Sequence, residues 1–136
     1  MASCVSHLEC SLTGEVFPPR EAHGISRAGG PLFVRYDAGA LKAALSKDVL
    51  AARAGGLWRY HELLPVEMEK NRLSLGEAMT PIVRAPRIEA LRGGADLYVK
   101  DESRLPAGST AMRGLALAGS MAKERRLRHL AMAADN

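Results

Sequence analysis

The sequence predicts an α/β protein. Short runs rich in branched and aromatic residues, at 32–36 and 97–100, favour β-strands. Runs rich in alanine and leucine, at 40–54 and 111–125, favour helices. Of the 136 residues, 47% are hydrophobic and 25% are charged, which is typical of a folded globular chain and not of a disordered one. Aromatic residues make up only 4%, so we expect small aliphatic side chains to dominate the core.

The first half of the chain is expected to begin with strands and continue with helices. We predict strands over 8–17 and 32–36, the second because its apolar residues alternate in part. We predict a helix over 40–54, where apolar residues recur at helical spacing and a glycine pair follows as a stop signal. A shorter helix is predicted over 57–64, ending before Pro65.

The second half changes towards an alternating order of strand and helix. After a weakly helical stretch at 87–91, we predict a strand over 97–100, a helix over 111–125 and a strand over 129–133. That order is one βαβ unit, which should cross over right-handed. Because parallel strands are normally covered on both faces, we expect open sheet edges, exposed apolar faces and dependence on a partner.

Charge and hydropathy restrict the possible partners. The net charge is +4, but basic and acidic residues are mixed along the chain. The concentrated basic stretch at 123–128 ends a predicted helix, where cations favourably meet the helix dipole. No aromatic stacking residues or binding motif accompany it. We interpret it as a solvated helix end and expect no nucleic acid as a partner.

No hydrophobic run approaches membrane-spanning length, so we expect no membrane partner. Residues 1–5 lack the basic and apolar regions of a signal peptide. Two cysteines, Cys4 and Cys10, make no disulfide framework. These features favour the reducing cytoplasm.

One group of residues near the N-terminus has the types that bind metals: Cys4, His7, Cys10 and His23. Their spacings are unusual for a tetrahedral zinc site. Ordinary surface residues are the preferred interpretation, and we assign no metal ligand. A small zinc or nucleic-acid module remains a distant third hypothesis for the function.

Six blocks of the chain occur together in a distinctive order and spacing. They are Leu8–Gly14, Gly29–Asp37, Leu57–Pro65, Leu75–Pro81, Leu97–Ser103 and Leu105–Gly114. Together they resemble the N-terminal portion of the threonine synthases, which are pyridoxal-phosphate (PLP) enzymes of fold type II, related to the tryptophan synthase β chain. No single block is decisive, because Lys100-Asp101-Glu102 after a strand is shared by many related PLP enzymes. The ordered set carries the resemblance.

The resemblance implies an incomplete α/β fold, the N-terminal part of a fold type II enzyme. Residues 1–56 would supply N-terminal strands and a helix, and residues 57–136 the truncated start of the PLP-dependent domain, with the βαβ unit near its C-terminal end. The family converts O-phosphohomoserine to threonine and phosphate on PLP. The protein contributes a Schiff-base lysine that also shuttles protons.

The block Leu105–Gly114 departs from the family at that lysine. The family segment reads Pro-Thr-Gly-Ser-Phe-Lys-x-Arg-Gly, and Pro106, Gly108, Ser109 and Arg113 match it without a gap. Ala111 therefore occupies the lysine position, and alanine has neither an amine nor a titratable group. We assign no catalytic residue and expect the chain to be inactive.

Other lysines do not compensate for this loss, because Lys100 and Lys123 match other positions of the family. At the end of the chain, Asn136 matches an asparagine that contacts the cofactor ring in the family. We name it as a candidate cofactor-binding residue. The serine and glycine that normally precede it read Ala133 and Asp135 here.

The remaining matches have structural alternatives. Lys100, Asp101 and Glu102 can pair with one another or with Arg104 at a strand end, and Ser109 and Arg113 can cap and pack a helix. Glu77, Thr80 and Pro81 belong to a loop that lies near the active site in the family. We interpret Tyr36, Trp58 and Tyr60 as packing residues. In the zinc ribbon of some relatives, Cys10 matches the first cysteine, but the other positions are Thr13, Ile25 and Ala28.

Two hypotheses of different classes remain. In the first, the chain is a threonine synthase product that needs the missing C-terminal part, with PLP as the implied cofactor. In the second, it is a non-catalytic protein that binds a partner, such as an intact threonine synthase subunit. A lysine at position 111 together with a C-terminal fragment distinguishes them.

Overall fold

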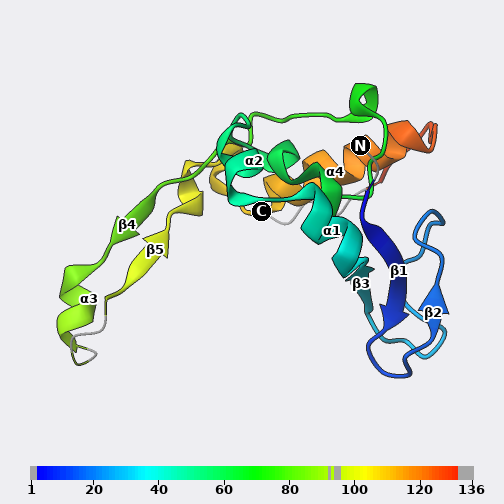
Figure 1. Ribbon diagram of the computed structural model, residues 1–136, viewed down its shortest axis with the longest axis horizontal. Coiled ribbons are helices and arrows are strands. Elements are labelled where there is room, and N and C mark those ends of the chain that lie inside the picture. The colour runs from blue at the N-terminus through cyan, green and yellow to red at the C-terminus, as the bar shows by residue number, and fades with distance from the viewer. Residues whose placement is uncertain (1–2, 92, 94–95, 132–136) are drawn as a thin grey trace.

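The computed structural model describes residues 3–91, 93 and 96–131, and within them the chain forms two antiparallel sheets joined by short helices (Figure 1). The strands are β1 (Val5–Cys10), β2 (Val16–Phe17), β3 (Leu32–Tyr36), β4 (Ile82–Arg84) and β5 (Tyr98–Lys100). The α-helices are α1 (Ala38–Ala44), α2 (Lys47–Ala51), α3 (Pro86–Leu91) and α4 (Ala111–Glu124). The 3₁₀ helices are η1 (Leu57–Leu63), η2 (Glu69–Asn71), η3 (Glu102–Arg104) and η4 (Pro106–Gly108). The predicted mixture of helices and strands is confirmed.

The N-terminal sheet has the strand order β2-β1-β3, with both pairs antiparallel. Its third strand confirms the prediction over 32–36, but the prediction of one strand over 8–17 is wrong. A turn separates β1 from β2, because Gly14 adopts φ +73° and donates its N–H to the carbonyl of Cys10 at 3.0 Å. Arg35 on β3 binds the Glu9 carboxylate on β1 through two nitrogens, at 2.6 and 3.2 Å.

The single helix predicted over 40–54 is wrong, because the chain forms α1 and α2 instead. Leu45 is extended after α1. The Ser46 hydroxyl then accepts a hydrogen bond from the Val49 N–H at 3.1 Å, which is the usual cap of a new helix. The apolar pattern continues through the break, which is why it predicted one helix.

The segment predicted as a helix over 57–64 is the 3₁₀ helix η1, and it carries the most buried charge among the described residues. The side chain of Glu62 is 0% exposed. Arg53 binds both of its oxygens, at 2.8 and 2.5 Å, and His61 Nε2 lies 3.3 Å from one of them. The Arg53 hydrogen bonds lower the pKa of Glu62 to about 2. This ion pair fixes η1 to the end of α2.

Strands β4 and β5 form an arm that projects from the rest of the molecule (Figure 1). They pair antiparallel, with Val83 opposite Val99. The predicted strand over 97–100 is confirmed as β5, but its neighbour is β4, because the chain turns back through α3. Residues 129–131 form no strand and 132–133 lie outside the described residues, so the predicted βαβ unit is not found in the described part.

Helix α4 confirms the helix predicted over 111–125. Its side chains form hydrogen bonds with the segment that contains η2. The Leu73 N–H donates to Ser120 Oγ at 2.8 Å, and Ser120 is fully buried. The Glu124 carboxylate accepts the N–H groups of Glu67 and Met68, at 2.8 and 3.2 Å, and the Asn71 amide at 2.9 Å. The polar face of α4 therefore binds backbone that precedes it by about 50 residues.

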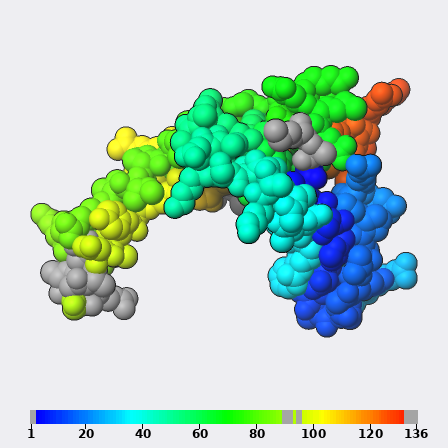
Figure 2. Space-filling model, in the orientation of Figure 1, coloured from blue at the N-terminus to red at the C-terminus, as the bar shows by residue number. Residues whose placement is uncertain are grey.

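The molecule is an open arch, with the β4–β5 arm at one end and the N-terminal sheet at the other (Figure 2). Its accessible surface is 9717 Å², whereas a compact protein of 14.6 kDa exposes about 6,900 Å². Ile82 on the arm is 67% exposed and Tyr98 is 57% exposed. The expectation of exposed apolar faces is confirmed. Among the helices that the structure describes, none is long and apolar enough to cross a membrane.

We predict that acid destabilises the fold through Glu62. Its folded pKa is about 2 and its ordinary pKa is 4.5. The ionised Glu62 carboxylate therefore contributes fully to the free energy of unfolding above about pH 4.5, and this contribution is lost as the pH falls towards 2. Urea unfolding between pH 6 and 2 measures it. Glu102 titrates in the same pH range, so the unchanged chain must be compared with Glu62→Gln at each pH. The difference between their free energies of unfolding should shrink towards low pH. A difference that stays constant would contradict the prediction.

Candidate functional site

Polar side chains from three of the matched sequence blocks meet beside the N-terminus of α4. Thr80, Lys100, Glu102 and Arg113 form this group, which we call the Glu102 cluster. Lys100 Nζ lies 2.5 Å from Thr80 Oγ1 and 3.3 Å from a Glu102 oxygen. The Thr80 hydroxyl donates to the Glu102 carboxylate. Arg113 binds the same carboxylate through Nε and Nη2, at 3.0 and 3.3 Å.

Backbone pairing brings these residues together. Thr80 and Pro81 lead into β4, and the Asp101 N–H, just after β5, donates to the Pro81 carbonyl at 2.9 Å. Lys100 at the end of β5 is therefore held beside Thr80. Arg113 lies in the first turn of α4 and also donates to the carbonyl of Ala78 at 3.0 Å. The cluster thus joins the arm to α4.

Two cations share one carboxylate in the cluster, because Lys100 and Arg113 both pair with Glu102. Hydrogen bonds from Arg113 first, and from Thr80 second, lower the pKa of Glu102 to about 2. Asp101 points elsewhere, because its carboxylate accepts from Ser103 and pairs with Arg104 at 3.2 Å. The predicted pairing within Lys100–Glu102 and with Arg104 is confirmed. This arrangement fixes the strand end and leaves Lys100 half exposed.

Ala111 is the first residue of α4 and is exposed. Its N–H donates to the Ser109 hydroxyl at 3.2 Å, but the N-cap of α4 is Thr110, which makes no side-chain capping hydrogen bond. A methyl group cannot form an imine, and the neighbouring Lys100 amine is bound to Thr80 and Glu102. The residues present here do not fit covalent attachment of PLP. The candidate cofactor residue Asn136 lies outside the described residues.

The loop before the cluster has a structural role. Glu77 is 6% exposed, and its carboxylate accepts from the Ser74 hydroxyl at 3.1 Å and from the Leu75 N–H at 2.7 Å. Gly76 adopts φ +85°, and a Cβ there would lie 3.3 Å from Pro106. Glu77 therefore stabilises a tight turn against the segment that leads to α4.

The Cys4, His7, Cys10 and His23 alternative is wrong. Cys4 precedes β1 and Cys10 ends it, and the rise of a strand separates them by about 20 Å. His23 Nε2 donates to the Pro18 carbonyl at 3.0 Å. Over the described ranges, no group of three or more cysteine, histidine and acidic side chains could hold a metal ion.

Cys10 has its own small polar environment. Its thiol contacts Ser26 Oγ at 3.0 Å, and the hydrogen bonds of Ser26 and Thr13 lower the pKa of Cys10 to about 7. Ser26 also accepts from the Gly30 N–H at 3.0 Å. Cys10 therefore fixes two turns of the N-terminal sheet to one another.

The three aromatic residues that we expected to pack behave differently. Trp58 is partly buried, and its Nε1 donates to the Leu73 carbonyl at 2.7 Å. Tyr36 is 40% exposed and Tyr60 is 36% exposed. Both tyrosines nevertheless make contacts, since the Tyr36 hydroxyl donates to the Leu63 carbonyl at 3.1 Å and the Arg59 guanidinium lies 5.5 Å from the centre of the Tyr60 ring.

A charged cavity that the sequence did not predict lies beside η1. It has a volume of about 350 Å³ and lies between η1, η2 and the loop at 72–77. Its charged wall consists of Arg53, Arg59, Arg72, Glu69 and Glu77. No motif marks it, because these residues come from separate segments whose approach depends on the fold.

We predict that the Thr80 hydroxyl stabilises the Glu102 cluster. Thr80→Val keeps the shape of the side chain but leaves Lys100 and Glu102 without their shared hydroxyl, so the free energy of unfolding should fall by about 1 to 3 kcal/mol. Urea unfolding measures the change. Thr110→Val is the matched control, because the Thr110 side chain makes no capping hydrogen bond. Equal effects of the two substitutions would refute a role for the cluster.

Three curated proteins similar to this chain are threonine synthases. The chain is 36% identical over 115 residues to that of Methanocaldococcus jannaschii, covering 85% of this chain and 28% of that protein. It is 33% identical over 119 residues to that of Methanosarcina acetivorans, covering 87% and 28%. With that of Halalkalibacterium halodurans it is 40% identical over 70 residues, covering 52% and 20%.

The match covers most of this chain but only part of each relative. The chain spans little more than a quarter of the length of the first two threonine synthases. No family model matches the chain, and no solved structure matches it. The ordered blocks and these identities agree: the chain is similar, over most of its own length, to part of a threonine synthase.

Proposed function

We propose that this chain is a threonine-synthase-like protein that does not catalyse the reaction itself and that associates with complementary threonine synthase sequence. One observation carries the first half of the proposal. The Glu102 cluster is assembled beside the N-terminus of α4, yet the position that the resemblance assigns to the lysine holds the exposed Ala111. The surroundings of the site are retained without its reactive amine.

The missing amine removes two functions at once. In PLP enzymes of this kind the cofactor supplies an electron sink, and the lysine both attaches it and moves protons. Alanine can do neither. Lys100 is no substitute, because its amine binds the Thr80 hydroxyl and the Glu102 carboxylate. Turnover of O-phosphohomoserine, the substrate that the resemblance implies, therefore needs a lysine from another source.

The β4–β5 arm supports the second half of the proposal. In the part of the chain that the structure describes, β4 pairs only with β5, so each strand has a free edge. Isolated two-stranded ribbons are marginally stable, and free edges accept further strands. Threonine synthases continue far beyond the matched stretch, which is 28% of their length. Their remaining sequence, or an intact threonine synthase subunit, is the partner that we propose.

We predict that complementation restores activity only when a lysine is added. The C-terminal fragment of a threonine synthase such as the relative from Methanosarcina acetivorans should bind the chain. Only Ala111→Lys with this fragment and PLP should then form threonine from O-phosphohomoserine. Binding is measured by co-purification and turnover by phosphate release.

Ala43→Lys is the matched control, since Ala43 is exposed on α1, far along the chain from the cluster. Threonine formation by the unchanged chain with the fragment would contradict its lack of catalysis. Failure of every variant to bind the fragment would contradict the proposed association. Binding without turnover by Ala111→Lys would favour a purely non-catalytic, partner-binding protein.

We also predict that PLP does not stabilise the chain. A ligand that binds the folded state raises the urea midpoint, and here no residue is available for attachment at position 111. Unfolding followed by circular dichroism, with and without PLP, should give superimposable curves. A midpoint that rises with the PLP concentration would reveal cofactor affinity despite Ala111.

A further inference from the structure

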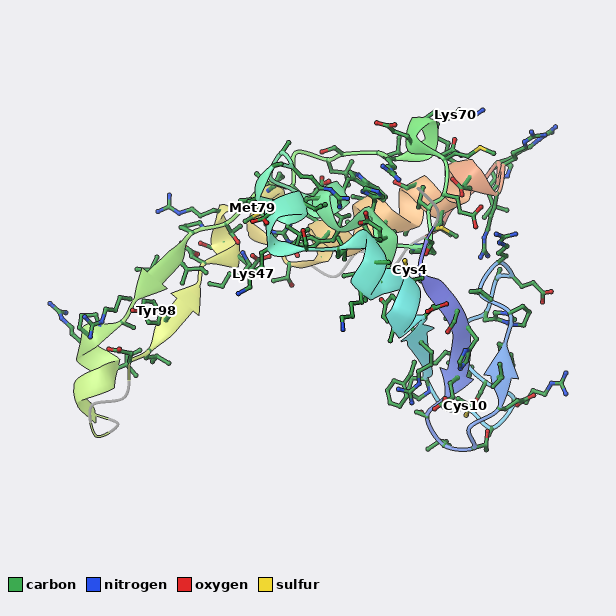
Figure 3. All side chains as sticks on the ribbon, viewed as in Figure 1. Cys4, Cys10, Lys47, Lys70, Met79 and Tyr98 are labelled. Carbon is green, nitrogen blue, oxygen red and sulfur yellow. The ribbon has the colours of Figure 1, made fainter. Side chains whose placement is uncertain are left out.

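The 350 Å³ cavity beside η1 is separate from the Glu102 cluster and independent of the function proposed above. Trp58 forms one wall, and the Gly55-Gly56 pair forms another. A Cβ on Gly55 would lie 2.5 Å from Met79, which Figure 3 labels beside α2. A side chain at position 55 would thus displace its neighbour. The cavity has the size of a small-molecule site, at the lower end of the usual range.

Two arginines in the wall form no close ion pair with a described carboxylate, although Arg72 interacts electrostatically with Glu124 from a longer distance. The Arg72 guanidinium lies 5.8 Å above the Trp58 ring, and its Nε is buried without a hydrogen-bond partner. The Nε of Arg59 is also buried without a partner, whereas its two terminal nitrogens donate to Met79 Sδ and to the Leu50 carbonyl. Among the described residues, no carboxylate lies within 4.0 Å of either guanidinium. Arg53 differs, because the buried Glu62 compensates its charge.

Two carboxylates in the same wall have no basic partner. Glu77 accepts hydrogen bonds from Ser74 and from the Leu75 N–H, but no cation of the described residues pairs with it. Glu69 likewise makes no ion pair with any described side chain. Unpaired charges of both signs therefore face one small cavity. Glu69 is exposed, whereas Glu77 is only 6% exposed, and a charge with so little access to water is stabilised by a partner of opposite sign.

The charges in the cavity wall select the class of ligand. The carboxylates of Glu69 and Glu77 repel a phosphate or another dianion, and the guanidinium groups repel a simple cation. A small molecule with both charges satisfies both sets. We propose that this cavity binds a free α-amino acid, with its carboxylate towards Arg72 and Arg59 and its ammonium group towards Glu69 and Glu77. A small side chain would then contact the Trp58 ring.

The chain contains one tryptophan, so Trp58 fluorescence reports directly on this cavity. Titration with L-alanine should change the fluorescence with a dissociation constant of about 1 mM, which corresponds to a few well-placed polar contacts. N-acetyl-L-alanine lacks the ammonium group and L-alaninamide lacks the carboxylate. Each should bind the unchanged chain at least about tenfold more weakly.

Equilibrium dialysis with labelled L-alanine provides a second readout that does not depend on Trp58. Arg72→Gln and Glu69→Gln should each weaken binding about tenfold. Arg27→Gln should leave it unchanged, because the Arg27 side chain is 88% exposed at a distant turn. Circular dichroism checks that each variant is folded.

The analogues test the proposal even where a variant does not fold. Equal binding of N-acetyl-L-alanine and L-alanine would show an anion site and overturn the proposal. Equal binding of L-alaninamide would show a cation site and do the same. Absence of binding to the unchanged chain up to about 50 mM L-alanine, by both readouts, would show that the cavity takes no amino acid of this kind.

Discussion

The fold depends on polar side chains that bind distant backbone, because the chain buries very little apolar surface. The buried apolar residues of the described part are Cys4, Cys10, Val66, Leu105 and Ala116. An apolar core of this size cannot offset the conformational entropy of about 130 ordered residues. Each polar contact adds only about 1 kcal/mol net, so the arrangement of elements depends on many such contacts acting together.

Helix α4 shows how these contacts organise the molecule. Near its C-terminus, Ser120 and Glu124 bind the backbone of 67–73. At its N-terminus, Arg113 binds Glu102 and the carbonyl of Ala78. One helix therefore positions both the segment before η2 and the base of the β4–β5 arm. The Glu102 cluster therefore has a structural role of its own, because it ties the arm to α4.

Local sequence patterns predicted the elements that local chemistry determines. The strand over 32–36 and the helix from Ala111 follow from branched runs and helical spacing, and both are found. The break at Ser46 was not predicted, because the apolar spacing continues through it and the hydroxyl cap decides the outcome. Strand β4 was not predicted either, since its three residues form a strand only by pairing with β5.

For the candidate sites too, the sequence predicted some features and the fold determined the others. Thr80, Glu102 and Arg113 were each recognisable within a sequence block, but their contact depends on the antiparallel pairing of β4 and β5 and on the position of α4. The cavity beside Trp58 left no trace in the sequence, because Arg59, Arg72 and Glu77 belong to different segments. Sequence blocks therefore identify which residues belong to a site, and pairing of distant backbone decides which of them meet.

Ala111 also has a physical consequence for the start of α4. It occupies the first position of α4, where a cation opposes the helix dipole at a cost of about 0.3 to 1 kcal/mol. A lysine there would also join Lys100 and Arg113, which together outnumber the single Glu102 carboxylate. Alanine has the highest helix propensity and adds no charge. In a chain with so small an apolar core, alanine at position 111 therefore suits the start of the helix better than a lysine would.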